Sequence, residues 1–207
     1  DRILRKLKEN NRLMPHFHLS IQSASTRVLR AMKRHYDEKQ IAKTLEKIYQ
    51  CNPNIYVGID MIAGFPTETE KEHQDSIALL SRLPWTRLHV FPYSERAETT
   101  ALRLKKTVPM RVRKARAQDW IELSNFRLEA FVKKFEHNPI EGVLFETCEM
   151  KNNEYFTAGH ARNYIRVKTK VSSLNEGKSL LNKDHTVEGI KALPHMQLDW
   201  IMEGRLI

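Results

Sequence analysis

Polar side chains recur on one face of three predicted strands, and they are the residues best placed to bind a ligand. The strands are 16–22, 55–65 and 88–94, and apolar residues fill the other face of each. The polar face offers His18, Ser20, Gln22, Gly58, Asp60, His89 and Tyr93. A sheet covered by helices on both sides normally keeps such positions apolar. The pattern therefore predicts a sheet that curves around a lumen holding a ligand.

The histidines and cysteines do not form a metal-ligand pattern. His16 and His18 share a strand face, but two histidines without a third ligand are more often packed or hydrogen bonded. Cys51 and Cys148 stand 97 residues apart, which is the spacing of neither a disulfide framework nor a zinc or iron–sulfur site. We therefore expect no metal on this chain and two reduced thiols, as is usual in a cytoplasmic protein.

Helical segments separate the predicted strands. They begin at Ser25, Asp37, Thr69 and Pro109, which are residue types that cap or open helices, and Glu72 completes a capping box with Thr69. Alternating strands and helices are typical of a parallel sheet. The rules for handedness and crossover connections between parallel strands are compatible with a doubly wound sheet or with part of a (βα) barrel. The polar face favours the barrel. The inner stripe of the last helix is expected to hold Val112, Ala115, Leu128, Phe131 and Phe135.

The pattern changes after residue 137. Short β-type runs follow at 143–150, 155–161, 163–171, 186–193 and 198–207. Five short strands in this length are typical of a small barrel or sandwich. We therefore predict an α/β fold with two domains: a partial (βα) barrel at 1–137 and a small all-β domain at 138–207.

Charge is concentrated in the first part of the chain. The sequence has a net charge of +10, and residues 1–137 carry 26 basic and 16 acidic side chains, whereas 138–207 carry nine of each. The densest run is Arg103, Lys105, Lys106, Arg111, Arg113, Lys114 and Arg116. Such a run is either a solvated helix face or a phosphate-binding strip for nucleic acid. Tyr164, set among cations at 159–170, indicates either a base-stacking site or an edge strand guarded by charge.

The composition excludes some classes of protein. Hydrophobic residues make up 41% and charged residues 29%, which argues against wholesale disorder. The sequence has no run of about 18 apolar residues, so we expect no membrane span. The chain opens on charged residues and without Met, so we expect no secretory signal and a processed or truncated protein.

Four motifs, in order and at matching separations, carry a resemblance to a known family. They are HLSIQSASTRVLRAMKRHY (18–36), GIDMIAGFPTETE (58–70), LHVFPYSERAETTA (88–101) and GHARNYIRV (159–167). Together they resemble the radical S-adenosylmethionine tRNA methylthiotransferases. The LHVFPYS stretch is most similar to the MtaB type, the branch that acts on threonylcarbamoyladenosine beside the anticodon.

The resemblance implies a fold, cofactors and a partner. It implies that residues up to 137 are the later half of a radical-SAM barrel and that the tail is an OB-like TRAM domain that binds the tRNA anticodon stem-loop. The cofactors would be S-adenosylmethionine and two [4Fe–4S] clusters in the full-length enzyme. The six cluster cysteines of the family are absent here, so we expect the missing amino-terminal part of the same enzyme to hold both clusters, and this chain alone to be inactive.

Roles follow from the positions that match the family motifs. The residues expected to contact S-adenosylmethionine are Ser20, Gln22, Ser23, Arg34, Asp60, Gly64 and Phe65. Those expected to face the substrate adenosine are Tyr93, Ser94 and Arg96, and those expected to contact RNA are Arg162, Asn163, Tyr164 and Arg166. Catalytic residues are not identified by the motifs.

The sequence departs from the family pattern at three turns. Ala24, Thr67 and the pair Ala97-Glu98 stand where the family usually has glycine or Pro-Gly. Glycine permits positive φ or a close backbone approach, so loop shapes near the cofactor are affected. Two other functions stay open: a stand-alone RNA-binding module without catalysis, and a relative of the ribosomal-protein methylthiotransferases.

Overall fold

The computed structural model describes residues 2–195 and 199–207. The chain forms two compact units, one of residues 17–124 and one of residues 1–16 with 125–207. Within the described residues, no helix combines the length and the apolar character needed to cross a membrane. Leu198, the first residue of the last predicted strand, lies outside the described residues.

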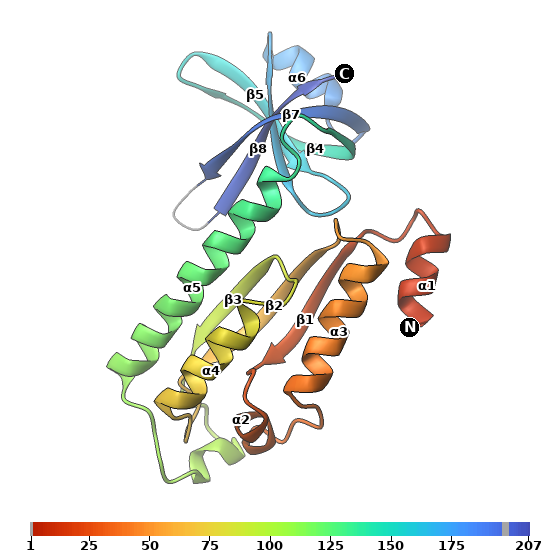
Figure 1. Cartoon of the computed structure of the whole chain (residues 1–207). Coiled ribbons are helices and arrows are strands. Elements are labelled where there is room, and N and C mark those ends of the chain that lie inside the picture. Colours follow the sequence, from red (N-terminus) through yellow and green to blue (C-terminus); the bar gives the residue numbers. More distant parts are fainter. Residues whose placement is uncertain (1, 196–198) are drawn as a thin grey trace. The chain divides into compact units, whose positions relative to one another are not determined.

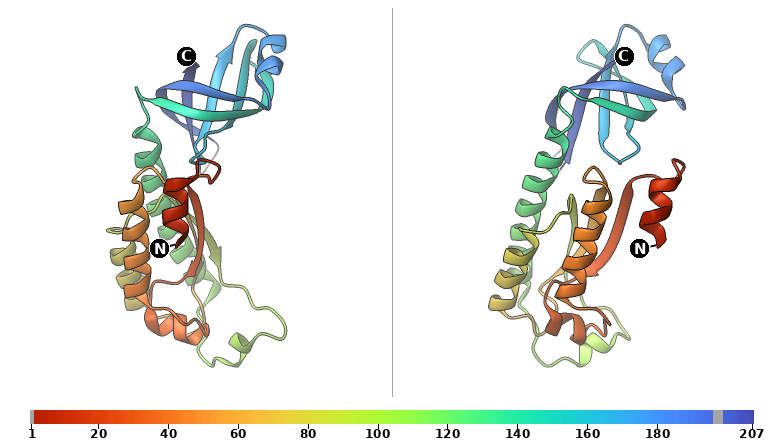
Figure 2. Two further views of the ribbon diagram at one scale, coloured as in Figure 1. Left: turned by 90° about the vertical axis from the view of Figure 1, so that its right-hand side faces the viewer. Right: turned by 45° about the vertical axis from the view of Figure 1, so that its right-hand side comes forward.

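The unit 17–124 is built on a three-stranded sheet (Figure 1). Its strands are β1 (His16–Gln22), β2 (Tyr56–Ala63) and β3 (Arg87–Pro92), in the order β1-β2-β3 with β2 and β3 parallel. Its helices are α2 (Thr26–Ala31), α3 (Glu38–Cys51), α4 (Glu70–Leu80), the 3-10 turn η1 (Thr100–Arg103) and the first part of α5 (Met110–Lys133). Helices α3 and α4 cover one face of the sheet (Figures 1 and 2).

Local capping signals fix where these helices begin. The Ser25 side chain caps α2, and the capping box predicted for Thr69 and Glu72 is present at α4. Asp37 forms a further capping box with Gln40 at α3. Each cap satisfies backbone N–H groups that have no partner inside the helix.

The inner face of α5 differs from the predicted stripe. Ala115 is exposed, and Phe135 lies beyond the last residue of the helix. Arg113 and Arg116 are buried in place of Ala115, together with Trp120. The prediction was wrong here because the helix buries two cations with carboxylate partners, which an apolar-periodicity argument cannot detect.

The second unit contains a closed five-stranded barrel with strand order β4-β5-β6-β8-β7. Strands β6 and β8 are parallel and the other pairs are antiparallel. Val143, Phe145, Val167, Val187 and Met202 have no exposed surface and form its interior. The elements of this unit are α1 (Arg2–Glu9), the end of α5, β4 (Pro139–Lys151), β5 (Glu154–His160), β6 (Arg166–Val171), α6 (Leu174–Leu180), β7 (Asp184–His195) and β8 (Asp199–Leu206). The predicted fold class, α/β with a parallel sheet and a small separate β domain, is confirmed.

Candidate functional site

Three of the predicted polar residues meet on one face of the parallel sheet. Nε2 of His18 lies 2.7 Å from Oδ1 of Asp60, and the Ser20 hydroxyl donates to Oδ2 of Asp60 over 3.0 Å. Asp60 lies on β2, between the two β1 side chains and His89, its register partner on β3. The carboxylate therefore holds one nitrogen of His18 and the Ser20 hydroxyl in fixed positions.

His89 adds a second imidazole to this face. The ring centroids of His18 and His89 are 5.0 Å apart. A Cβ atom at Gly58 would lie 3.3 Å from Nδ1 of His18 and 3.7 Å from Nε2 of His89, so the glycine leaves room for both rings. Burial lowers the pKa of His89, and His18 and Arg87 lower it further while Asp60 opposes them. The lowered pKa favours the neutral His89 imidazole, which can donate one hydrogen bond and accept another.

Phe91 belongs to the same face and was missed from the sequence. It pairs in register with Ile62 near the carboxyl end of β3, and its side chain is 54% exposed. Because side chains alternate along a strand, Phe91 points to the same side as His89. That period of two was available in the sequence, because Phe91 lies two residues after His89. The exposed ring offers a stacking surface on this side of the sheet.

The residues after β1 form the turn that leads into α2. Gln22 has a left-handed backbone, with φ of +67°. Ser23 and Ala24 are buried, and the Ser23 hydroxyl oxygen accepts the N–H of Ser25. Arg34 is exposed after the end of α2. Of the four residues predicted here for the cofactor, Ser20 shares the Asp60 cluster, whereas Gln22, Ser23 and Arg34 lie outside it.

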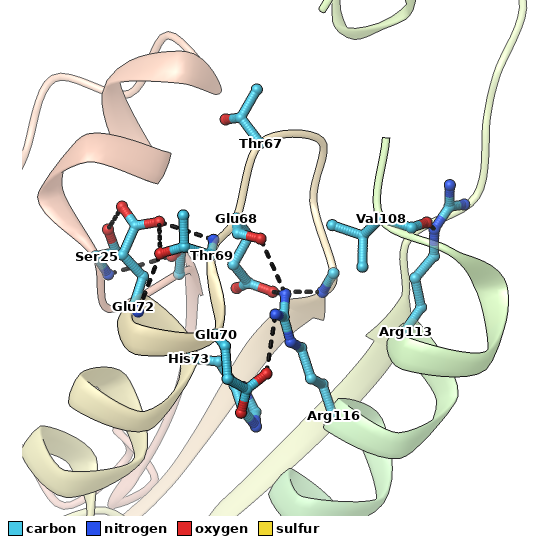
Figure 3. A network of polar contacts seen from close by, with 12 residues as sticks. Ser25, Thr67, Glu68, Thr69, Glu70, Glu72, His73, Val108, Arg113 and Arg116 are labelled. Carbon is cyan, nitrogen blue, oxygen red and sulfur yellow. Dashed lines mark hydrogen bonds and ion pairs between the residues drawn. The ribbon is translucent and has the colours of Figure 1, made fainter. Parts of the chain in front are cut away.

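The loop between β2 and α4 is held by a buried ion pair (Figure 3). Nη1 of Arg116 lies 2.9 Å from Oε2 of Glu68, and each side chain is 6% exposed. The same Glu68 oxygen accepts the N–H of Gly64 over 2.8 Å, and Nη2 of Arg116 lies 3.0 Å from Glu70. Burial raises the pKa of Glu68, with Arg116 opposing that rise. The loop at the carboxyl end of β2 is thus tied to helix α5.

A second buried arginine ties the end of β3 to the same helix. Arg113 donates to the carbonyl oxygens of Val108 and Tyr93 over 2.6 and 2.8 Å and forms an ion pair of 2.6 Å with Glu95. A Cβ atom at Gly64 would lie 2.5 Å from Cγ of Arg113, so the glycine is required for this packing. Gly64 therefore makes room for a protein side chain.

The aromatic residues at these strand ends are part of the core. Phe65 and Tyr93 are both buried, with ring centroids 5.3 Å apart, and they pack with Val28. Ser94 and Arg96, which follow Tyr93, are exposed. The structure thus places Phe65 and Tyr93 where they shape the strand ends and leaves Ser94 and Arg96 accessible.

These contacts correct the interpretation of the cationic run at 103–116. Arg113 and Arg116 point inward to carboxylates and form neither a solvated face nor a phosphate-binding strip. The partners lie 18 and 48 positions earlier in the sequence, beyond the reach of local charge patterns. The other five cations of the run remain exposed.

The residues predicted for RNA lie on and beside the β barrel. Tyr164 is half exposed, has a left-handed backbone, and stacks on His160 with ring centroids 4.9 Å apart and on His16 with centroids 4.3 Å apart. His160 is held by Glu146, with Nδ1 2.8 Å from Oε2. Arg162 packs over Gly142, Asn163 is buried, and Arg166 is half-buried.

The donor atoms of the chain fit one implied cofactor and not the other. A [4Fe–4S] cluster takes three or four cysteine thiolates, but the sequence has two cysteines far apart, and the described residues contain no group of three metal-ligating side chains. Iron–sulfur clusters therefore do not fit these residues. Oxygen atoms of Asp60 and Ser20 fit the hydroxyl and ammonium donors of S-adenosylmethionine.

Comparison with known proteins agrees with the motifs. Residues 1–80 match the model of the Radical SAM superfamily. The chain is 33% identical over 153 residues to the threonylcarbamoyladenosine tRNA methylthiotransferase MtaB of Aquifex aeolicus, which is 74% of this chain and 37% of that protein. It is 33% identical over all 207 residues to the tRNA-2-methylthio-N(6)-dimethylallyladenosine synthase of Bacillus subtilis, 39% of that protein.

A third relative also matches most of this chain and less than half of its own length. The MtaB of Bacillus subtilis is 31% identical over 167 residues, 81% of this chain and 37% of that protein. The chain thus spans less than half the length of these relatives. The resemblance stated from the motifs is confirmed: the chain is similar to tRNA methylthiotransferases over most or all of its length, and residues 1–80 match the Radical SAM superfamily.

Proposed function

We propose that this chain is the substrate-binding and RNA-binding part of a tRNA methylthiotransferase that modifies an adenosine beside the anticodon. The observation that carries the proposal is the similarity to two kinds of tRNA methylthiotransferase over 74% and 100% of the chain. The polar strand face and the half-exposed Tyr164 on the β barrel support it, because the reaction needs both a ligand site and an RNA-binding surface.

The chemistry explains why such a site binds a cofactor. The carbon of an adenine C–H bond is neither acidic nor electrophilic, so acid–base catalysis cannot functionalise it. S-adenosylmethionine, reduced by one electron from an iron–sulfur cluster held outside these residues, would supply the radical that this bond requires, and this chain would bind and orient the reactants and exclude water. Asp60 and the Ser20 oxygen would accept hydrogen bonds from the cofactor, since the Ser20 hydroxyl already donates to Asp60. His89, whose lowered pKa favours the neutral imidazole, would add a further hydrogen-bonding group.

The individual roles remain proposals with different structural support. Ser20 and Asp60 lie together on the polar face and fit direct contact with S-adenosylmethionine. Gly64 and Phe65 would act by shaping the loop, since they pack against Arg113 and Val28. Gln22, Ser23 and Arg34 would contribute through the turn after β1. Ser94 and Arg96 would face the substrate, and Tyr93 would shape the end of β3 from the core. Arg162, Asn163, Tyr164 and Arg166 would form the RNA side.

The iron–sulfur clusters would be held outside these 207 residues. The chain spans 37–39% of the relatives named above, and its two cysteines cannot provide six thiolates. We place the partial barrel at 1–137 and a TRAM-like RNA-binding domain at 138–207. The enzyme would act in the cytoplasm on the anticodon stem-loop, and the isolated chain would be inactive.

The relatives suggest two candidate substrates. The MtaB relatives are named for threonylcarbamoyladenosine, and the synthase of Bacillus subtilis for dimethylallyladenosine. The LHVFPYS motif favours threonylcarbamoyladenosine. The full-length match of this chain to the synthase is the specific observation that favours dimethylallyladenosine.

Nuclear magnetic resonance of the histidine side chains tests the cofactor site. We expect S-adenosylmethionine to shift the His18 and His89 resonances of the full chain, and Asp60→Asn to weaken that binding at least tenfold. Asp75→Asn, on the helix that covers the other sheet face, is the matched control and should bind as the parent does. Unchanged His18 and His89 resonances at saturating S-adenosylmethionine would overturn the assignment of this face.

A further inference from the structure

The carboxyl ends of strands β2 and β3 meet at a backbone hydrogen bond, in which the N–H of Tyr93 donates to the carbonyl oxygen of Ala63 over 2.8 Å. Gly64 follows Ala63 directly and begins the loop to α4. The Arg113 side chain of α5 contacts both chain segments at this point, Gly64 on one side and Tyr93 on the other. Arg113 is buried, so it lies between the two strand ends as part of the protein interior.

The two parts of the Arg113 side chain have different contacts. Its aliphatic stem packs on Gly64, where a Cβ atom would lie 2.5 Å from Cγ and 3.0 Å from Cβ of the arginine. Its guanidinium binds the segment after β3: Nη1 donates to the carbonyl oxygen of Tyr93 over 2.8 Å, and Nη1 and Nη2 donate to the Glu95 carboxylate over 3.0 and 2.6 Å. Nε donates to the carbonyl oxygen of Val108 over 2.6 Å (Figure 3).

These contacts fix the orientation of the guanidinium and of its partner. A carboxylate that accepts two parallel N–H bonds from an arginine is held in a defined geometry. The guanidinium carbon of Arg113 also lies 5.1 Å from the centroid of the Tyr93 ring, within the range of a cation–π contact. Glu95 stands between Ser94 and Arg96, and all three are exposed. The segment is therefore anchored through the Glu95 carboxylate while its two neighbours face solvent.

We propose that Arg113 is a positioning residue that sets the segment 94–96 against the loop that begins at Gly64. The inference rests on the proposed function, in which Ser94 and Arg96 face the substrate and the Gly64 loop lies on the cofactor side. Gly64 determines where the Arg113 stem lies, and the guanidinium at the end of that stem determines where Glu95 lies. The placement matters because a misplacement of about 1 Å between reacting groups can cost about 100-fold in rate.

The variant Arg113→Lys separates the two contacts, because lysine keeps Cβ and Cγ beside Gly64 but lacks the planar guanidinium. Amide relaxation of the full chain, measured by nuclear magnetic resonance, should show the order parameters of residues 94–96 falling from about 0.85 to below about 0.6. Residues 64–68 should keep the values of the parent. Arg111→Lys makes the same change at an exposed position of α5 and is the matched control, which should leave both segments unchanged.

Variants of the two contacted residues test each half of the link. Glu95→Gln removes the charge of the carboxylate and should make residues 94–96 more mobile, but less so than Arg113→Lys, because the two backbone hydrogen bonds of Arg113 remain. Gly64→Ala would place a Cβ atom 2.5 Å from the Arg113 stem. It should therefore shift the amide resonances of residues 94–96, although Gly64 lies on another loop.

Two ligands give a readout that a general loss of structure would not produce. Arg113→Lys should bind the nucleoside threonylcarbamoyladenosine about fivefold more weakly than the parent, the effect of about one lost hydrogen bond, and S-adenosylmethionine as the parent does. Unchanged order parameters at residues 94–96 in Arg113→Lys, or an equal weakening for both ligands, would overturn this inference alone. A parent chain that does not bind the nucleoside would overturn the substrate assignment of the proposed function, whereas the order parameters would still decide whether Arg113 positions the segment.

Discussion

Arg116 and Glu68 form an ion pair in which neither side chain is more than 6% exposed, with Nη1 2.9 Å from Oε2. Glu68 also accepts the Gly64 N–H, and Gly64 follows directly after β2. The backbone at the carboxyl end of this strand is therefore positioned by a residue of helix α5. Ligand sites on parallel sheets lie at this end of the strands, so the pair sets the shape of the candidate cofactor loop.

Removing one partner of this pair should destabilise the fold strongly. Glu68→Ala leaves the Arg116 guanidinium buried beside Glu70 alone, and we expect a loss of about 3–5 kcal/mol in the free energy of unfolding, measured by urea denaturation. Asp75→Ala breaks the exposed pair with Lys71 and should cost about 0.3–0.5 kcal/mol. The double variant Glu68→Leu/Arg116→Met should recover part of the loss, because it removes the unpaired charge but leaves the buried Gly64 N–H without its acceptor. A cost below about 1 kcal/mol for Glu68→Ala would contradict a buried, mutually dependent pair.

Acid stability should depend on Glu72. Burial raises the pKa of this carboxyl, but hydrogen bonds from Arg27 and Thr69 outweigh burial and hold the pKa at about 2, against an ordinary value of 4.5. A lowered pKa gives stability that is present above 4.5 and lost as the pH falls towards 2. Glu72→Gln should therefore reduce the loss of stability between pH 4.5 and 2 in urea titrations, and Arg27→Gln should do the same. If neither variant changed the loss of stability between pH 4.5 and 2, the dependence of acid stability on Glu72 would be refuted.

The turns that lack glycine should gain stability when glycine is introduced. Thr67 and Glu98 have φ of +77° and +67°, a left-handed backbone that is costly for both and most costly for the β-branched Thr67. We expect Thr67→Gly and Glu98→Gly each to stabilise the fold by about 0.5–1 kcal/mol in thermal or urea unfolding. Ala24 is buried and is not among the residues with positive φ, so Ala24→Gly should destabilise. If the three variants all changed the free energy of unfolding in the same direction, backbone strain would not be the cause.

Two variants of the polar face should move the pKa of His89 in opposite directions. Burial lowers this pKa first, and His18 adds to the effect while Asp60 opposes it. His18→Gln should therefore raise the pKa of His89, and Asp60→Asn should lower it, as followed by proton resonances during a pH titration. Shifts of one sign in both variants would mean that the two side chains act on His89 through structural change.

Local sequence signals predicted much of the fold, but they could not predict pairs between residues far apart in the sequence. Strand β1 has the predicted bounds, and α4 has the predicted capping box, because alternation and capping depend on residues within a few positions. The polar cluster of His18, Ser20 and Asp60 followed from the same alternation. Burial of Arg113 and Arg116 could not be predicted, since it depends on Glu95 and Glu68, which only the folded chain brings to α5.

Among the site residues, too, local patterns can identify some, and others depend on contacts that only the folded chain makes. Phe91 could have been identified by its position two residues after His89, whereas the packing of Arg113 on Gly64 requires the folded position of α5 beside the end of β2. The boundary at residue 138 stays a prediction. It lies just before β4, which begins at Pro139.

The affinity of the full chain for a tRNA anticodon stem-loop, with and without the modified adenosine, tests the central proposal most directly. We predict salt-dependent binding that is tighter for the stem-loop carrying threonylcarbamoyladenosine than for the unmodified one. A base would stack on Tyr164 by replacing one of the two histidine rings that contact it. Tyr164→Ala should then weaken binding by about 1–3 kcal/mol, whereas Tyr164→Phe keeps the ring and should bind as the parent does. Equal affinity for the stem-loops and for a DNA duplex of the same length, with no effect of Tyr164→Ala, would contradict the assignment of this chain to tRNA modification.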